Sequence, residues 1–130
     1  MAMQHSPRFL ALVHEAKSRI QEISAEQVKS RLDAGELPLL LDVREESEFA
    51  VDHLPRAIHL GKGILERDIE ARVPDLDTEL ILYCGGGYRS ALAADALQKM
   101  GYRRVLSLAG GIREWRARGY PLESGSSKAP

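Results

Sequence analysis

Cysteine is nearly absent from this sequence, and its scarcity excludes several kinds of site. Cys84 is the single cysteine among 130 residues, so neither a disulfide within the chain nor the cysteine pairs of common metal motifs can form. His53 and His59 show no spacing typical of metal ligands, and we expect no metal. A chain without disulfides fits a reducing compartment, so we expect a cytoplasmic protein.

Long apolar runs and an excess of one charge are also missing. No apolar stretch approaches the ~20 residues of a membrane-spanning helix, so we expect no membrane partner. The 18 basic and 19 acidic residues leave a net charge of -1, and this balance does not favour binding to nucleic acid. What remains is the composition of an ordinary globular domain.

Apolar runs alternate with helical patterns along most of the chain. Strands are expected at residues 37–43, 57–60, 79–84 and 103–108, and a short extended segment at 19–23. Helices are expected at 7–19, 25–35, 45–53, 64–73, 90–100 and 111–119. A capping box of Ser24 and Gln27 opens the second helix. This alternation predicts an α/β fold, with an open parallel sheet flanked by helices on both faces.

The two ends of the chain lie outside this pattern. Residues 1–19 are expected to form an N-terminal helical extension, whose apolar stripe consists of Phe9, Leu10, Leu12, Val13 and Ala16. Such a stripe either packs on its own domain or forms a surface for a partner or a second copy. The main domain is expected over residues 20–122, and the small polar segment at 123–130 is expected to be disordered.

Several functional side chains are expected at one edge of the sheet, because ligands of open parallel sheets bind beyond the carboxyl ends of the strands. Asp42 and Arg44 follow one strand, Lys62 follows the next, and Cys84 follows a third. Asp42 and Arg44 form either a plain surface ion pair or a support for the site. Lys62 either recruits an anion or is a solvated loop lysine.

The segment YCGGGYRS, residues 83–90, connects a strand to a helix that we expect to begin at Ser90. Its three glycines can adopt positive φ angles and turn backbone N–H groups inward. The helix start and Arg89 add positive charge, so the loop favours an anion and would stabilise Cys84 as a nucleophilic thiolate. The alternative is an inert, buried Cys84 beside a simple turn. Tyr88 either flanks a substrate or packs against its neighbours.

Four segments together resemble the rhodanese (sulfurtransferase) homology domain: DVREESEF, DHLPRAIHL, YCGGGYRSALAADALQKMGY and LAGGIREWRARGYPLE. The resemblance covers roughly residues 20–122, so the helix at 7–19 lies outside it. It implies a rhodanese-like fold with five parallel strands, in which residues 19–23 form the fifth. The chain departs from the family at Asp52 and Arg56, where glycines are usual, in a turn expected to lie away from the active edge.

The resemblance also implies a reaction. Cys84 would take sulfur from a donor such as thiosulfate, become a persulfide, and pass the outer sulfur to cyanide or to the thiol of a small molecule or protein. No cofactor would be needed, because the cysteine itself carries the sulfur. Asp42 and Arg44 match the family's Asp-x-Arg signature and would brace the loop. The residues implied to bind substrate are Gly85, Gly86, Gly87, Tyr88, Arg89 and Ser90.

The length of the cysteine loop separates this reaction from a rival. Related phosphatases have one more residue between cysteine and arginine, which makes room for a tetrahedral phosphate. Four residues separate Cys84 from Arg89, which is the shorter form associated with sulfur transfer. The sequence therefore predicts a sulfurtransferase. A non-enzymatic interaction or sulfur-carrier module is the first alternative, and a small phosphatase or arsenate reductase is the second.

Overall fold

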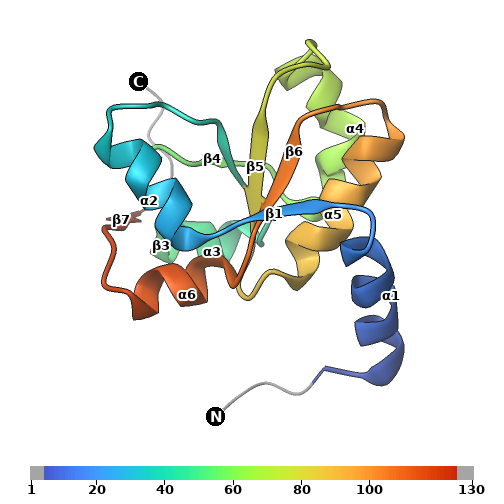
Figure 1. Ribbon diagram of the computed structural model, residues 1–130, viewed down its shortest axis with the longest axis horizontal. Helices are drawn as coiled ribbons and strands as arrows, with labels where there is room; N and C mark the ends of the chain where they lie inside the picture. The colour runs from blue at the N-terminus through green and yellow to red at the C-terminus, as the bar shows by residue number, and fades with distance from the viewer. Residues whose placement is uncertain (1–4, 126–130) are drawn as a thin grey trace.

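A parallel sheet with helices on both faces forms the centre of the computed structural model, which describes residues 5–125 (Figure 1). Five strands lie in the order β1-β6-β5-β2-β4, and all of their pairings are parallel. Their bounds are β1 (Gln21–Ile23), β2 (Leu40–Asp42), β4 (Ile58–His59), β5 (Leu80–Tyr83) and β6 (Val105–Leu108). The predicted fold class is confirmed, and residues 21–23 provide the fifth strand.

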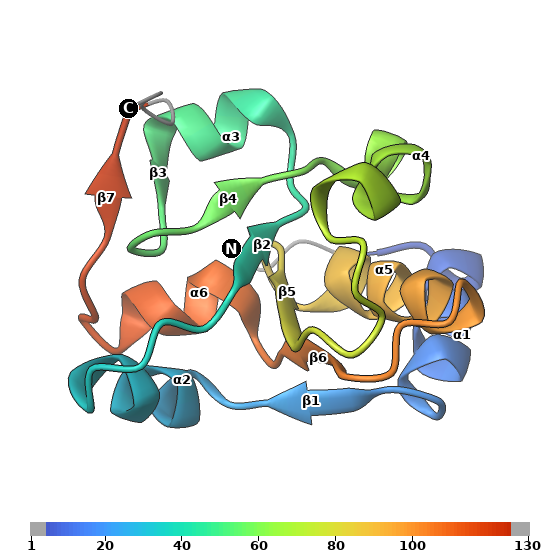
Figure 2. The same cartoon turned by 90° about the horizontal axis from the view of Figure 1, so that it is seen from above.

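Helices cover the two faces of the sheet in separate groups (Figure 2). One group consists of α2 (Ala25–Asp33), α3 (Glu46–Val51) and α6 (Gly111–Ala117), and the other of α4 (Lys62–Arg72) and α5 (Tyr88–Lys99). All residues of β2 and β5 are buried between the groups, which explains why β5 is apolar throughout and β2 is apolar up to Asp42. None of the helices within residues 5–125 has the length and apolar character needed to cross a membrane.

Local sequence signals set the ends of these helices. The predicted capping box is present: Ser24 Oγ accepts from the Gln27 N–H at 3.0 Å, and the Gln27 side chain accepts from the Ser24 N–H at 2.9 Å. Gly35 follows α2 with a φ of 87°, the left-handed conformation that ends many helices. The buried Trp115 and Ile112 of α6 belong to the core, as expected.

The N-terminal helix α1 (Pro7–Lys17) packs on α5, so its contact is with its own domain. The junction is held by Arg19, which donates to the two carboxylate oxygens of Asp95 at 2.9 and 2.7 Å. The predicted stripe is only partly correct, because Val13 is buried whereas Leu10 and Leu12 are 40% and 57% exposed. Because α1 lies at the margin of the domain, it packs against the domain through a narrower face than its apolar stripe predicted.

The segment after residue 122 differs from its prediction. Glu123 and Ser124 form strand β7 (Glu123–Ser124), which pairs antiparallel with β3 (Asp52–His53). The prediction of disorder is therefore wrong for these two residues, and residues 126–130 lie outside the described part of the chain. Backbone pairing with β3 and side-chain contacts of Glu123 hold a segment whose composition carries no strand signal.

Candidate active site

Cys84 lies directly after β5, at the carboxyl end of a central strand, and is 1% exposed. Its sulfur accepts hydrogen bonds from the backbone N–H groups of Gly87, at 3.2 Å, and Ser90, at 3.3 Å. The Ser90 hydroxyl lies 3.5 Å from the sulfur and 2.8 Å from the hydroxyl of Ser107 on β6. Donors converging on one buried sulfur suit an atom that carries negative charge.

The conformation of the loop corrects two sequence predictions. Only Gly87, with a φ of 96°, has a positive φ among the three glycines, so Gly85 and Gly86 do not adopt the expected conformation. Gly87 is the N-cap of α5, and the helix begins at Tyr88, two residues before the expected start. Ser90 therefore lies inside the first turn, where its N–H has no partner within the helix and is free to meet the sulfur.

Further backbone donors surround the sulfur. The N–H groups of Gly86, Tyr88 and Arg89 make no hydrogen bond to any acceptor among the described residues. They belong to the loop and to the first turn of α5, whose unpaired donors favour an anion. An additional atom or group bound to the Cys84 sulfur therefore has donors within the same loop.

The Gly-Gly pair after β6 fixes α6 beneath the cysteine loop. The N–H groups of Ile112 and Arg113 donate to the carbonyl oxygens of Cys84 and Gly85 at 2.9 and 3.0 Å. A Cβ atom at Gly111 would lie 2.5 Å from the Cys84 oxygen, and Gly111 has a φ of 57°. Glycine is required here both for the backbone conformation and for the close approach to the loop.

Replacement of Gly111 by alanine is expected to displace the cysteine loop. The left-handed backbone alone costs about 1–3 kcal/mol of unfolding free energy for a side-chain-bearing residue, and the clash with Cys84 adds to it. Gly119→Ala is the matched control, because Gly119 has a φ of 71° but no atom within 4 Å of its Cβ position. We expect urea unfolding to show a lower free energy of unfolding in both variants. The reactivity of the Cys84 thiol should fall only in Gly111→Ala. Equal reactivity in the two variants would contradict this role.

Arg89 does not project alone over the loop, because its guanidinium pairs with Glu48 of α3 at 2.9 and 3.3 Å. The hydrogen bond to Glu48 raises the pKa of Arg89, and the same contact lowers the pKa of Glu48. Glu48 also accepts from the N–H of Glu45 at 2.9 Å, which completes a capping box at the start of α3. One carboxylate thus orients the loop arginine and offsets its charge.

Glu48→Gln is expected to cost within about 1 kcal/mol of unfolding free energy, because the ion pair is partly exposed. The pKa of Glu48 is lowered in the folded state, so its contribution is fully present above its ordinary pKa, from roughly pH 5 upward, and is lost in acid. Urea unfolding of the wild type and of Glu48→Gln across pH 3–8 should show a difference in the free energy of unfolding that becomes smaller in acid. Glu46→Gln, which alters an exposed neighbour, should show no such trend. A difference that grows in acid would exclude the ion pair as its cause.

Asp42 and Arg44 form a buried ion pair rather than a surface pair. Arg44 Nη2 lies 2.7 Å from Asp42 Oδ2, and the two residues are 4% and 0% exposed. Burial lowers the pKa of Arg44, but the hydrogen bonds and charge of Asp42 outweigh it and raise the pKa. Removing both groups from water requires this close pairing, because an unpaired buried charge is strongly unfavourable.

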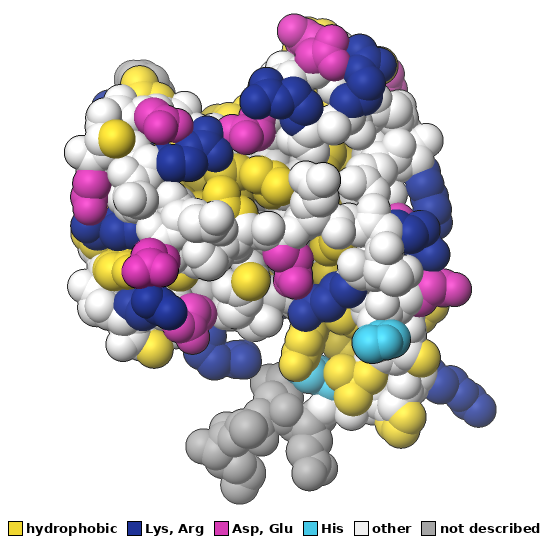
Figure 3. Space-filling view, viewed as in Figure 1, with side chains coloured by type: hydrophobic (Ala, Val, Ile, Leu, Met, Phe, Trp, Pro, Cys, Tyr) yellow, Lys and Arg dark blue, Asp and Glu magenta, His cyan; other side chains and the backbone are white. Residues whose placement is uncertain are grey.

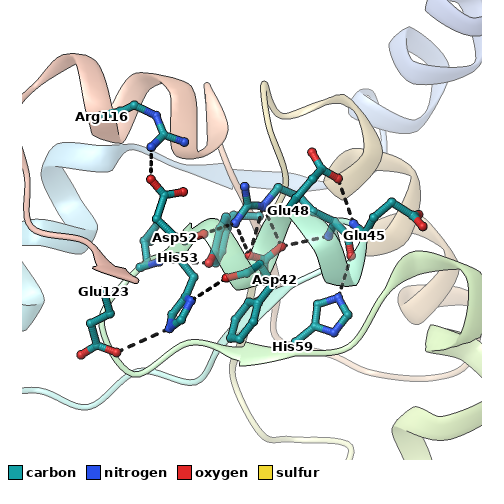
Figure 4. A network of polar contacts seen from close by, with 12 residues as sticks. Asp42, Glu45, Glu48, Asp52, His53, His59, Arg116 and Glu123 are labelled. Atoms are coloured by element: carbon teal, nitrogen blue, oxygen red, sulfur yellow. Dashed lines mark hydrogen bonds and ion pairs between the residues drawn. The ribbon is translucent and has the colours of Figure 1, made fainter. Parts of the chain in front are cut away.

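The hydrogen bonds of this pair lead to α3 rather than to the cysteine loop. Arg44 donates to the carbonyl oxygen of Asp52 at 2.6 Å, and the Arg44 carbonyl lies 2.8 Å from His59 Nε2. Figure 4 shows Asp42 at the centre of this network, with Asp52 reaching Arg116 on the far side. The pair therefore holds the end of the helix that carries Glu48. Neither Asp52 nor Arg56 lines the pocket over Cys84, and Asp52 is joined to the Asp42–Arg44 pair through its carbonyl oxygen alone.

A pocket of about 400 Å³ opens over Cys84. Its lining includes four of the predicted residues besides the cysteine, namely Gly85, Gly86, Tyr88 and Arg89. Gly87 and Ser90 contact the sulfur but do not line the pocket. Lys62 does not line the pocket either. Sequence reasoning missed the remaining lining residues, which are His5, Phe9, Glu48 and Arg113.

Tyr88 both lines this pocket and packs against α1. Its ring centroid lies 4.8 Å from that of His5 and 6.4 Å from that of Phe9, both in edge-to-face orientation. Lys17 Nζ lies 5.3 Å from the same ring centroid. The packing alternative for Tyr88 therefore applies, a role beside a substrate stays a prediction, and the N-terminal helix forms one wall of the pocket.

Comparison with known proteins extends these observations. The model of the Rhodanese-like domain family matches residues 24–118. A sulfurtransferase from Allochromatium vinosum is 35% identical over 103 residues, covering 79% of this chain and 94% of that protein. YrkF of Bacillus subtilis, named as a candidate sulfur carrier protein, is 35% identical over 103 residues, covering 78% of this chain. The chain spans 54% of the length of that relative.

Solved structures show the same architecture. The thiosulfate sulfurtransferase of Pseudomonas aeruginosa superposes with a TM-score of 0.80 at 27% identity, over 92% of this chain and 23% of that chain. RPA3614 of Rhodopseudomonas palustris, a protein of unknown function described as a possible tyrosine phosphatase, gives a TM-score of 0.77 at 30% identity. That alignment covers 95% of this chain and 99% of that chain.

Proposed function

Because the chain belongs to the rhodanese-like family, we propose that it is a sulfurtransferase that carries sulfur as a persulfide on Cys84. The donor is an anionic sulfane-sulfur compound such as thiosulfate, and the acceptor is cyanide or the thiol of a small molecule or protein. The observation that carries the proposal is the loop geometry, in which two backbone N–H groups donate to a buried sulfur at the floor of a pocket. We place the reaction in the cytoplasm, where a lone thiol stays reduced.

The first step is nucleophilic attack by the Cys84 thiolate on the outer sulfur of the donor. The new S–S bond forms as the S–S bond of thiosulfate breaks, and sulfite leaves with the electron pair. Arg89 lines the pocket and can face the anionic end of the donor, while Glu48 keeps its guanidinium in place. The N–H groups of Gly86, Tyr88 and Arg89 are the available donors for the outer sulfur of the persulfide.

The second step returns the cysteine to its starting state. A nucleophilic acceptor attacks the outer sulfur, the S–S bond to Cys84 breaks, and the cysteine leaves as a thiolate. Gly87 and Ser90 donate to that sulfur, so the leaving thiolate is stabilised by groups already in position. Both steps balance without a redox cofactor, because a sulfane sulfur atom passes from one nucleophile to another and each bond that forms replaces one that breaks.

A phosphatase would need different groups in this pocket. Glu48 is the one acidic side chain among the described lining residues, and its contact with Arg89 lowers its pKa. A carboxylate held in the ionised form is a poor proton donor to a leaving alkoxide. These features favour sulfur transfer over dephosphorylation.

The proposal is tested by supplying both substrate classes to one preparation. With thiosulfate and cyanide, we expect thiocyanate and sulfite to form in equal amounts under multiple turnover. With an aryl phosphate or arsenate, we expect no turnover above the buffer rate. Phosphate release without thiocyanate formation would overturn the proposal in favour of the phosphatase alternative. Neither product would favour a binding module built on the same fold.

A further inference from the structure

Apart from the sulfur of Cys84, the side chains around the pocket carry more positive than negative charge. Its lining contains Glu48, Arg89 and Arg113, and the first two form an ion pair. On α6, Arg116 pairs with Asp52, and Arg118, which follows the helix, pairs with Glu114. Arg113 has no acidic partner within residues 5–125, so it supplies the excess positive charge at the mouth of the pocket.

Arg113 is exposed, but its backbone and the end of its side chain both lie against the cysteine loop. Its N–H donates to the Gly85 carbonyl at 3.0 Å. Its guanidinium lies over Gly86, where an added Cβ atom would be 2.9 Å from Arg113 Nη1 and 3.4 Å from Cζ. The absence of a side chain at Gly86 therefore lets a cation lie against the loop, two residues from the nucleophile.

The wall of the pocket away from Arg113 is aromatic rather than charged. His5 and Phe9 come from the segment before residue 24, outside the part of the chain that matches the family, and they pack on Tyr88. Figure 2 shows α1 and α6 on opposite sides of the sheet, and Figure 3 shows hydrophobic side chains gathered over α1 at the lower right. A ligand above Cys84 thus meets aromatic rings on one side and a guanidinium on the other.

We infer that the sulfur acceptor is a small organic thiol that carries a carboxylate, an inference that rests on the proposed sulfurtransferase activity. A volume of about 400 Å³ falls in the range of pockets for small organic ligands, whereas cyanide would leave most of it empty. The thiol reaches the persulfide, its carbon chain lies along Phe9 and Tyr88, and its carboxylate pairs with Arg113. Arg113 is thus a specificity-determining residue.

The transfer step balances for such an acceptor. The acceptor thiolate attacks the outer sulfur of the Cys84 persulfide, and a new S–S bond forms as the bond to Cys84 breaks. The products are the acceptor persulfide and the Cys84 thiolate, so no oxidant or reductant is consumed. Arg113 acts only on the remote carboxylate and takes no part in bond making.

The acceptor preference tests this inference directly. Three thiols differ mainly in charge: 3-mercaptopropionate, 2-mercaptoethanol and cysteamine. With thiosulfate as donor, we expect kcat/KM, corrected for thiolate fraction, to favour the carboxylate over the neutral thiol by about fivefold, the strength of an exposed ion pair. Arg113→Gln should remove this preference. Arg118→Gln removes the same charge next to the same helix, outside the pocket lining, and should keep it.

A second measurement separates failure of this inference from failure of the proposed activity. Alkylation of the single cysteine by iodoacetate and by iodoacetamide needs no sulfur transfer, and it reports attraction of a carboxylate to the pocket. We expect the iodoacetate-to-iodoacetamide rate ratio to fall about fivefold in Arg113→Gln and to stay constant in Arg118→Gln. Sulfur transfer with no acceptor preference, or a ratio unchanged by Arg113→Gln, would overturn the inference. Loss of all transfer in the wild type would instead overturn the activity.

Discussion

Cys84→Ser is expected to abolish thiocyanate formation from thiosulfate and cyanide, with a fall in kcat/KM on the order of 10⁴-fold or more. A serine hydroxyl cannot form the persulfide, and its oxygen is a far weaker nucleophile than a thiolate at neutral pH. Initial rates measured with equal concentrations of wild type and variant give the comparison. A variant with more than about a hundredth of the wild-type rate would contradict covalent catalysis at this residue.

The same variant should remain folded, which makes its inactivity informative. The serine oxygen can accept from the N–H groups of Gly87 and Ser90 that now reach the sulfur. We therefore expect the free energy of unfolding to change by no more than about 1–2 kcal/mol. Urea unfolding of the variant provides this control. A much larger fall in the free energy of unfolding would mean that activity is lost because the variant does not fold.

Asp42→Asn is expected to lower the free energy of unfolding by about 3–5 kcal/mol, because it leaves the guanidinium of Arg44 buried without its counter-charge. Arg44 is 4% exposed and donates to both carboxylate oxygens of Asp42. We also expect the sulfurtransferase rate to fall at temperatures where the variant is still folded. Arg44 holds the carbonyl of Asp52 at the end of α3, and α3 carries the carboxylate that orients Arg89.

A double variant distinguishes charge burial from simple loss of packing. Asp42→Leu combined with Arg44→Met replaces the pair by apolar side chains and leaves no unpaired charge. Such replacements are often neutral or stabilising, so the double variant should recover most of the stability that Asp42→Asn loses. If the double variant is as unstable as the single one, the unpaired charge is not the cause of the destabilisation.

The sheet and the cysteine loop could be predicted because their signals are local. The β5 segment is apolar throughout and the β2 segment is apolar up to Asp42, as expected for strands covered on both faces. Gly35 and the Ser24–Gln27 box set the ends of α2 within a few residues of sequence. The cysteine, the glycines and Arg89 lie in one short segment, so their proximity needs no tertiary information.

The other walls of the pocket could not be predicted, because they reach Cys84 from distant elements. Glu48, Arg113 and Phe9 come from α3, α6 and α1, and no spacing in the sequence records which face of these helices meets the loop. Only Glu48 could be recognised from its neighbours in the sequence, because it closes a capping box that begins three residues earlier at Glu45. The charge of Arg89 was overestimated for the same reason, since its partner is on another element.

The turn before β4 shows how a tertiary contact overrides a local preference. Arg56 has a φ of 64°, the one positive value for a non-glycine residue among residues 5–125. This conformation costs roughly 1–2 kcal/mol for a residue with a side chain. Its N–H donates to Glu123 at 3.3 Å, and Glu123 also lies 3.6 Å from His53. The strand β7, which composition alone marked as disordered, thus anchors the turn where the family usually has glycine.

The mass of the intact protein after reaction with thiosulfate tests the central claim most directly. The protein would be freed of excess donor without a reducing agent, and its mass measured before and after addition of cyanide. We predict that the wild type gains the mass of one sulfur atom, that Cys84→Ser gains none, and that cyanide removes the added sulfur with release of thiocyanate. An unmodified Cys84 after thiosulfate treatment, in a protein that unfolds cooperatively, would contradict the persulfide mechanism.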